Sequence, residues 1–122
     1  MKKVFLLILL TTTLLSATAQ ETKRIELLNP LQFEQAIDDK NVQLIDIRTP
    51  LEYAEEHIEG SVNIDFLSQE SFKTAVQKLD KTKALYIYCR SGAISEKAAK
   101  QLQGLGFELI YDLRGGFLNW NK

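Results

Sequence analysis

The sequence predicts an α/β domain built on a mostly parallel central sheet with helices on both faces. Short apolar runs alternate along the chain with segments whose apolar residues recur at helical spacing. Strands that alternate with helices in this way pair in parallel through right-handed crossovers. Residues 20–122 contain no internal repeat, linker or low-complexity stretch, so we expect them to form one domain.

The first 19 residues have the pattern of a secretory signal peptide. Two lysines precede an apolar stretch from Val4 to Leu15, and Ala17-Thr18-Ala19 forms a small-x-small cleavage site. A membrane anchor is the alternative, but the apolar stretch is shorter than the roughly 20 residues that a span needs. We therefore expect residues 1–19 to be removed, leaving an exported, periplasmic or secreted protein that no longer contacts the membrane.

The composition of the remaining chain excludes several classes of partner. Lys2 and Lys3 belong to the leader, so residues 20–122 keep 16 acidic side chains and carry a net negative charge. No basic cluster is present, which argues against a nucleic acid or an anionic membrane as partner. A single cysteine cannot form an internal disulfide, and one cysteine with one histidine argues against a zinc site. No metal or organic cofactor is expected.

The first half of the domain begins with a predicted edge strand at Arg24–Leu28. Asn29-Pro30-Leu31-Gln32 then has the residues of a helix start: asparagine as N-cap, proline at the first helical position and glutamine three residues after the cap. We expect that helix to end near residues 39–41. Val42–Ile47 is a second strand with an apolar centre, and Thr49-Pro50 opens another helical turn.

The second half of the domain continues the alternation. The predicted elements are a short strand at Ser61–Ile64, a helix at Ser68–Leu79, a strand at Ala84–Tyr88, a helix at Ser95–Leu105 and a strand at Phe107–Tyr111. Ser95 is the expected cap of its helix, and Gly104 and Gly106 are candidates for the helix end. Three apolar residues near the carboxyl end are expected to cover the core: Phe117, Leu118 and Trp120.

Cys89 stands where the strand Ala84–Tyr88 meets the loop Arg90–Ser95. A loop that runs into a helix start aims several backbone N–H groups at one point and adds the positive end of the helix dipole. A thiolate is favoured there over a thiol, and Arg90 adds a cation suited to an oxyanion. Alternatively, Cys89 is a small buried hydrophobic residue, as most free cysteines are. The strand–loop–helix context favours the reactive thiol, because α/β sheets bind ligands at this edge.

Four segments resemble, in the family's order, the signatures of single-domain rhodaneses, which are sulfurtransferases. They are Asp46-Ile47-Arg48 with Glu52-Tyr53, His57–Ile64, Cys89-Arg90-Ser91-Gly92 and Arg114–Trp120. The resemblance implies a three-layer rhodanese-like domain over residues 20–122, with Cys89 as the catalytic residue that carries sulfur. It also implies a substrate-binding loop made of Arg90, Ser91, Gly92, Ala93, Ile94 and Ser95.

Other residues near the predicted site are assigned structural roles: Asp46, Arg48, His57, Gly115 and Gly116. Asp46 and Arg48 could be a catalytic carboxylate and cation, but the resemblance favours pairing with the backbone and with Glu52 to fix their loop. His57 could be a general base for Cys89. The resemblance instead places His57 in a turn, and a loop-activated thiolate needs no base. The two glycines permit a tight approach to the cysteine.

One position departs from the family pattern. Many thiosulfate-using members carry a second arginine at the sixth loop position, where this chain has Ile94, in register with Ala98 and Leu102 as a core contact. We expect sulfur transfer from thiosulfate or a persulfide, through a Cys89 persulfide, to a thiol or cyanide acceptor. The donor stays open, and a protein could also supply or accept the sulfur.

Three other functions compete with sulfur transfer as interpretations of this sequence. A binding or sulfur-carrier module without turnover would keep the same fold, and Ile94 favours it. A phosphatase or arsenate reductase needs an arginine about six positions after the cysteine, where this chain has Ser95. A thiol–disulfide oxidoreductase needs a second cysteine, which this chain lacks.

Overall fold

A five-stranded parallel sheet forms the centre of the computed structural model, which describes residues 23–39 and 41–120. Its strands are β1 (Arg24–Leu28), β2 (Gln43–Asp46), β3 (Val62–Asn63), β4 (Leu85–Tyr88) and β5 (Leu109–Leu113). They lie in the order β1-β5-β4-β2-β3, and every neighbouring pair is parallel. The predicted α/β fold with a parallel sheet is therefore confirmed. The predicted signal peptide, residues 1–19, lies outside the described residues.

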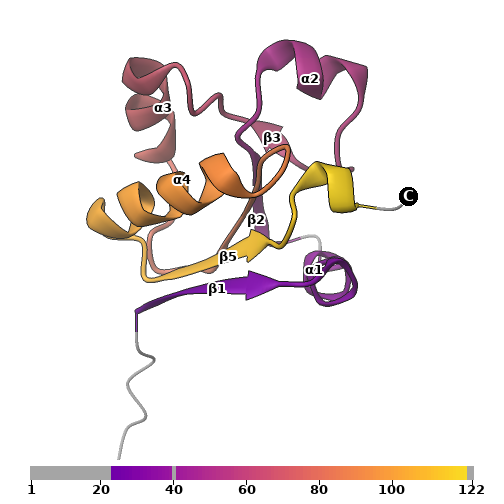
Figure 1. The fold of residues 1–122 in the computed structure, drawn as a ribbon. Helices are drawn as coiled ribbons and strands as arrows, with labels where there is room; N and C mark the ends of the chain where they lie inside the picture. The colour runs from indigo at the N-terminus through magenta and orange to yellow at the C-terminus, as the bar shows by residue number, and fades with distance from the viewer. Residues whose placement is uncertain (1–22, 40, 121–122) are drawn as a thin grey trace, which may run out of the picture.

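Helices cover both faces of the sheet, so the predicted three layers are present (Figure 1). The helices are α1 (Pro30–Ile37), α2 (Pro50–Glu55), α3 (Gln69–Val76), α4 (Ala93–Gly104) and the short 3-10 helix η1 (Phe117–Asn119). On one face α3 and α4 pack through Phe72, Val76 and Leu102, and on the other α1 and η1 pack through Phe33 and Phe117. Within residues 23–39 and 41–120, no helix is long and apolar enough to cross a membrane.

The starts of α1 and α2 follow local sequence chemistry. The Asn29 side chain accepts a hydrogen bond from the Gln32 N–H at 2.8 Å, and Gln32 Oε1 accepts one from the Asn29 N–H at 3.0 Å. This capping box, with Pro30 after the cap, confirms the predicted helix start. Thr49 and Glu52 form a second capping box at the start of α2.

Several boundaries differ from the prediction because packing sets them. Helix α4 begins at Ala93, two residues before the expected start, because Gly92 adopts a left-handed φ of 101° and serves as the N-cap. Ser95 is therefore not a cap but lies fully buried in the first turn. The last strand spans 109–113 rather than 107–111, because the residues that pair with β1 and β4 lie within 109–113. Phe107 precedes it as a buried core residue.

Two expected core contacts are wrong. Ile94 is 38% exposed and Leu118 is 64% exposed, whereas Phe117 and Trp120 pack against the core on the α1 face as predicted. Ile94 lies in the first turn of α4, while Ala98 and Leu102, one and two turns further along, are fully buried. Trp120 meets the Phe33 ring edge to face, with 6.0 Å between the ring centroids.

Candidate active site

Cys89 directly follows β4, a strand flanked by β5 and β2 in the sheet. Its side chain lies at the carboxyl edge of the parallel strands, and the residue is only 2% exposed. It begins the segment that we call the cysteine loop, residues 89–95, which leads from β4 into α4. Open α/β sheets bind ligands at this edge, so the fold puts the thiol where a reaction site is expected.

Two backbone N–H groups of the cysteine loop point at the sulfur. The Gly92 N–H donates to Cys89 Sγ at 3.0 Å, and the Ser95 N–H donates to the same atom at 3.3 Å. Both groups belong to the beginning of α4, a twelve-residue helix whose dipole is positive at this end. Preorganised donors at a helix start stabilise negative charge on sulfur, in the thiolate and in any anion that the sulfur carries.

The Gly115-Gly116 pair lies against the cysteine loop, backbone to backbone. A Cβ atom on Gly116 would come within 2.5 Å of the Arg90 carbonyl carbon and 2.6 Å of the Cys89 oxygen, and its φ is 63°. Residues 117 and 118 extend this backbone contact with the cysteine loop, which we call the seam. The Phe117 N–H donates to the Cys89 carbonyl at 2.8 Å, and the Leu118 N–H donates to the Arg90 carbonyl at 3.0 Å. Only glycine fits at position 116.

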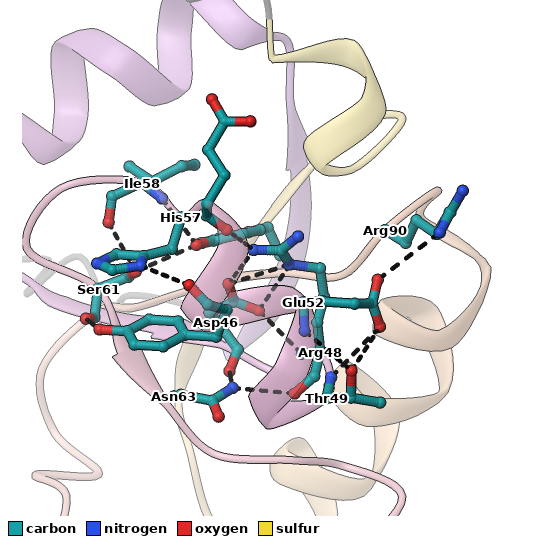
Figure 2. A network of polar contacts seen from close by, with 12 residues as sticks. Asp46, Arg48, Thr49, Glu52, His57, Ile58, Ser61, Asn63 and Arg90 are labelled. Carbon is teal, nitrogen blue, oxygen red and sulfur yellow. Dashed lines mark hydrogen bonds and ion pairs between the residues drawn. The ribbon is translucent and has the colours of Figure 1, made fainter.

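Arg90 lies at the rim of the site. Its side chain is 68% exposed, and its Nη1 lies 4.0 Å from Oε2 of Glu52 in α2 (Figure 2). Ile94 is also exposed, together with Leu51 beside Glu52 and Leu118 beside the Gly115-Gly116 pair. The cysteine loop therefore presents one accessible cation, Arg90, and one large exposed apolar side chain, Ile94.

Arg48 lies in a different environment, although it follows the neighbouring strand β2. Its Nη2 donates to Asp46 Oδ2 at 2.7 Å and to the Glu56 carbonyl at 2.6 Å, and its Nε lies 3.0 Å from both carboxylate oxygens. The guanidinium also lies over the Phe117 ring, 4.2 Å from the centroid. Burial alone would lower the pKa of Arg48, but the hydrogen bond and charge of Asp46 raise it above the ordinary value.

The network around Arg48 supports the structural interpretation of Asp46 and Arg48, with one correction. Glu52 was expected to pair with Arg48, but its carboxylate accepts from Thr49 Oγ1 at 3.0 Å and faces Arg90 (Figure 2). The second acceptor of Arg48 is the Glu56 backbone. Glu52 is needed at the start of α2 to complete the capping box, so it points away from Arg48.

His57 belongs to the loop between α2 and β3. Its ring stacks on the Tyr53 ring with 3.8 Å between centroids, and its Nδ1 lies 2.7 Å from the Tyr53 carbonyl oxygen. The same loop is pinned by the buried Tyr88 hydroxyl, which accepts from the Ile58 N–H at 3.0 Å. Burial raises the pKa of Tyr88, so this hydroxyl keeps its proton. These contacts favour the turn interpretation of His57 over that of a base for Cys89.

One residue beside the cysteine loop, Asp112, is not among the site residues predicted from the sequence. Asp112 in β5 is 1% exposed, and its Oδ2 lies 3.0 Å from the Ser95 hydroxyl. Burial, its largest influence, raises the pKa of Asp112 to about 6; the charge of Glu96 acts in the same direction and the Ser95 hydrogen bond opposes it. The signal was present in the sequence, because Asp112 is the one charged residue in the stretch Leu109–Leu113.

No metal site emerges from these residues. In the part of the chain that the structure describes, no group of three or more histidine, cysteine, aspartate or glutamate side chains converges to hold an ion. The chemistry available at the site is that of the Cys89 sulfur, the backbone donors around it and the exposed Arg90 guanidinium.

Comparison with known proteins identifies the family of this chain. Residues 29–122 match the family model of the rhodanese-like domain. The chain belongs to the rhodanese-like family. It is 35% identical over 100 residues to thiosulfate sulfurtransferase GlpE of Pseudomonas syringae, covering 82% of this chain and 88% of that protein.

A second relative and a solved structure extend the comparison. The chain is 34% identical over 104 residues to a tRNA uridine(34) hydroxylase of Pelagibacter ubique, covering 85% of this chain but only 35% of that protein. It therefore spans about a third of the length of this larger relative. The crystal structure of a rhodanese-like domain protein from Staphylococcus aureus superposes with a TM-score of 0.69 at 22% identity, covering 80% of this chain and 92% of that one. This likeness concerns the fold.

Proposed function

We propose that this protein is a sulfurtransferase that moves a sulfane sulfur from a donor to a nucleophilic acceptor through a persulfide on Cys89. The observation that carries the proposal is the pair of N–H groups, from Gly92 and Ser95, that meet the sulfur at the start of α4. The likeness to thiosulfate sulfurtransferase GlpE supports the same reaction class.

The proposed reaction has two steps. The Cys89 thiolate attacks the outer sulfur of the donor, an S–S bond forms, and the donor's own bond to that sulfur breaks. With thiosulfate, the leaving group is sulfite, which takes the electron pair. A thiolate or cyanide then attacks the outer sulfur of the persulfide, forming a new persulfide or thiocyanate and returning the Cys89 thiolate. The loop N–H groups stabilise the sulfur anion in both forms.

The rim of the site favours a persulfide over thiosulfate as donor. Thiosulfate is a dianion, and the cysteine loop itself offers one cation, Arg90, which already faces Glu52 at 4.0 Å. Ile94, the other large exposed side chain of the loop, is apolar. The reacting end of an organic persulfide carries one negative charge rather than two, so it depends less on a second cation at this site.

Mass spectrometry tests the proposal directly. We expect incubation with glutathione persulfide or thiosulfate to add about 32 daltons, one sulfur atom, to Cys89, and subsequent cyanide to remove it as thiocyanate. Cys89→Ser is the control and should acquire no sulfur. Absence of the adduct with every sulfane donor would rule out the proposed reaction.

The second candidate is a binding or sulfur-carrier module that keeps the fold without turnover. The exposed, uncharged Ile94 favours it, because the loop lacks a second cation for an anionic donor. This candidate predicts that Cys89→Ser still captures a partner protein while both forms are inactive in the thiocyanate assay. Measurable turnover by the wild type would exclude it.

We also propose that residues 1–19 direct export of the protein to the periplasm. The basic start, apolar stretch and small-x-small site support this. Amino-terminal sequencing of the protein from periplasmic extracts should then begin at Gln20. An intact Met1 on the soluble cytoplasmic protein would contradict it.

A further inference from the structure

Asp112 occupies a position where a carboxyl group is costly. It lies in β5, between β1 and β4, with Leu27 and Ile87 as its register partners, and it is 1% exposed. Its neighbours on this face of the sheet are core residues such as Ile110 and Ile87. A buried acid without an ion pair normally reflects a function or a special hydrogen bond.

The hydrogen bonds around Asp112 can be counted proton by proton. Ser95 Oγ lies 3.0 Å from Asp112 Oδ2 and 3.0 Å from the Gly92 carbonyl oxygen. A hydroxyl has one proton, so Ser95 can donate to only one of these two acceptors. If Asp112 is protonated, it donates to Ser95 Oγ, and Ser95 donates to Gly92. The neutral acid is the form that satisfies both contacts at once.

The second carboxyl oxygen points to the same protonation state. Asp112 Oδ1 is buried and has no hydrogen-bond partner among the described residues. An ionised carboxylate would leave a charged oxygen without a donor, whereas a neutral acid leaves only a carbonyl oxygen there. Burial also raises the pKa of Asp112 to about 6, so this proton is lost close to neutral pH.

Charged groups around Asp112 offer it no compensation. From α4, Glu96 acts on it as a like charge, and from the loop after β4 the Cys89 sulfur is the nearby ionisable group. On β1 and β4 its partners are apolar, and Arg114, directly after its own strand, is exposed. Among the described ion pairs, none includes Asp112.

The hydrogen-bond chain ends at the sulfur. The Ser95 hydroxyl contacts both Asp112 Oδ2 and the Gly92 carbonyl oxygen. The N–H groups of the same two residues, Ser95 and Gly92, donate to Cys89 Sγ. We propose that Asp112 is a positioning residue of this sulfur site, which holds the Gly92 and Ser95 donors on Cys89 in its protonated form and releases them when it ionises. Its role in turnover rests on the proposed sulfurtransferase function; its effect on the thiol does not.

Ionisation of Asp112 has two effects of the same sign. The Ser95 hydroxyl then donates to the Asp112 carboxylate instead of the Gly92 carbonyl, so the start of α4 loses one hydrogen bond. A negative charge also appears beside the site where a thiolate or persulfide anion must form. Negative charge on the Cys89 sulfur is therefore less stabilised when Asp112 is ionised than when it is neutral.

Alkylation of Cys89 tests this without relying on catalysis. Cys89 is the only cysteine, so the mass increase with iodoacetamide reports on this sulfur alone. The matched variant is Asp112→Asn, because its amide can donate to Ser95 as the neutral acid does but cannot ionise. Between about pH 5 and about pH 8 we expect the ratio of the variant rate to the wild-type rate to rise about fivefold, the factor of one neutral hydrogen bond.

A second variant tests whether Ser95 links Asp112 to the Cys89 sulfur. In the Ser95→Ala background, the rise with pH in the ratio of the Asp112→Asn rate to the Asp112 rate should be smaller than in the Ser95 protein, because the hydrogen-bonded link from residue 112 to the loop is missing and only the charge of Asp112 still acts on the sulfur. A ratio that stays constant with pH in the Ser95 protein would overturn the proposal. If Asp112→Asn does not fold, carbon-13 NMR of the wild type decides: an Asp112 carboxyl that is ionised throughout this range would overturn it equally.

The same samples separate this inference from the proposed function. Persulfide formation on Cys89 is measured alongside alkylation. A pH-dependent alkylation ratio without any persulfide would support the role of Asp112 and overturn the sulfurtransferase proposal. Persulfide formation with a constant ratio would support the sulfurtransferase and overturn the role of Asp112.

Discussion

Two arginines follow neighbouring strands at the same edge of the sheet, yet they differ in almost every physical respect. Asp46 and Tyr88 are register partners, so Arg48 and Arg90 leave β2 and β4 at similar heights. The Arg48 side chain is 5% exposed and donates to Asp46 and to the Glu56 backbone. The Arg90 side chain is 68% exposed and has one ion pair, at 4.0 Å.

The difference separates a charge that holds the protein together from a charge that can meet a ligand. The Arg48 guanidinium has partners on its donors and aromatic rings at its face, so binding a substrate would break buried interactions. Arg90 would give up only a long, exposed ion pair, which contributes little. An arginine at the carboxyl edge of a sheet is therefore not by itself evidence of a substrate contact.

The largest expected effect comes from Arg48→Met. It leaves the Asp46 carboxylate, which is fully buried, without its cation, and breaking a buried pair costs about 3–5 kcal/mol. We expect urea denaturation to show this loss in the free energy of unfolding. Arg90→Met, the matched control on the exposed arginine, should change it by less than about 1 kcal/mol. Equal losses for the two variants would abolish the distinction between them.

An intermediate effect is expected from Ile94→Arg. A guanidinium on this exposed position adds a second cation at the entrance, and a charge-assisted hydrogen bond should raise kcat/KM for thiosulfate about tenfold. For glutathione persulfide we expect a change of less than about twofold. Ile94→Gln is the control, since it adds polarity without charge. If Ile94→Gln improves thiosulfate turnover as much as Ile94→Arg does, charge does not select the donor.

The smallest effect is expected from Glu52→Gln. The amide can keep the capping box with Thr49 but no longer holds Arg90 by charge, so KM for an anionic donor should fall about two- to threefold at low salt. Raising the ionic strength should remove the gain. Glu55→Gln removes the same charge from the same helix without touching the Arg90 ion pair, and a matching gain there would point to net charge instead.

Much of the fold could be predicted because its signals are local. The Asn29 capping box with Pro30 is complete within four residues, so the sequence alone places the start of α1. The buried run that ends at Tyr88, followed by small residues and a helical pattern, places the cysteine at a strand–helix junction. The parallel pairing follows from the alternation itself, whereas the order β1-β5-β4-β2-β3 does not and comes from the structure.

The details of the site depend on contacts that sequence spacing does not reveal. Ile94 has helical spacing to Ala98, yet it is exposed because it sits in the first turn of α4 at the rim. Glu52 has a suitable spacing to pair with Arg48, but its helix cap directs it to Thr49 and Arg90. Asp112 becomes significant only once β5 is placed beside β4, because its partner Ser95 is 17 residues away.

The tight fit at Gly116 has a consequence for how the protein is made. Cys89 is synthesised before residues 116–118, whose backbone closes the seam against the cysteine loop. Until that stretch arrives, the carbonyl groups of Cys89 and Arg90 lack their N–H donors and water can reach them. Any shortened product that stops before Gly116 should therefore leave these two carbonyl groups without their N–H donors and hold the cysteine loop less firmly.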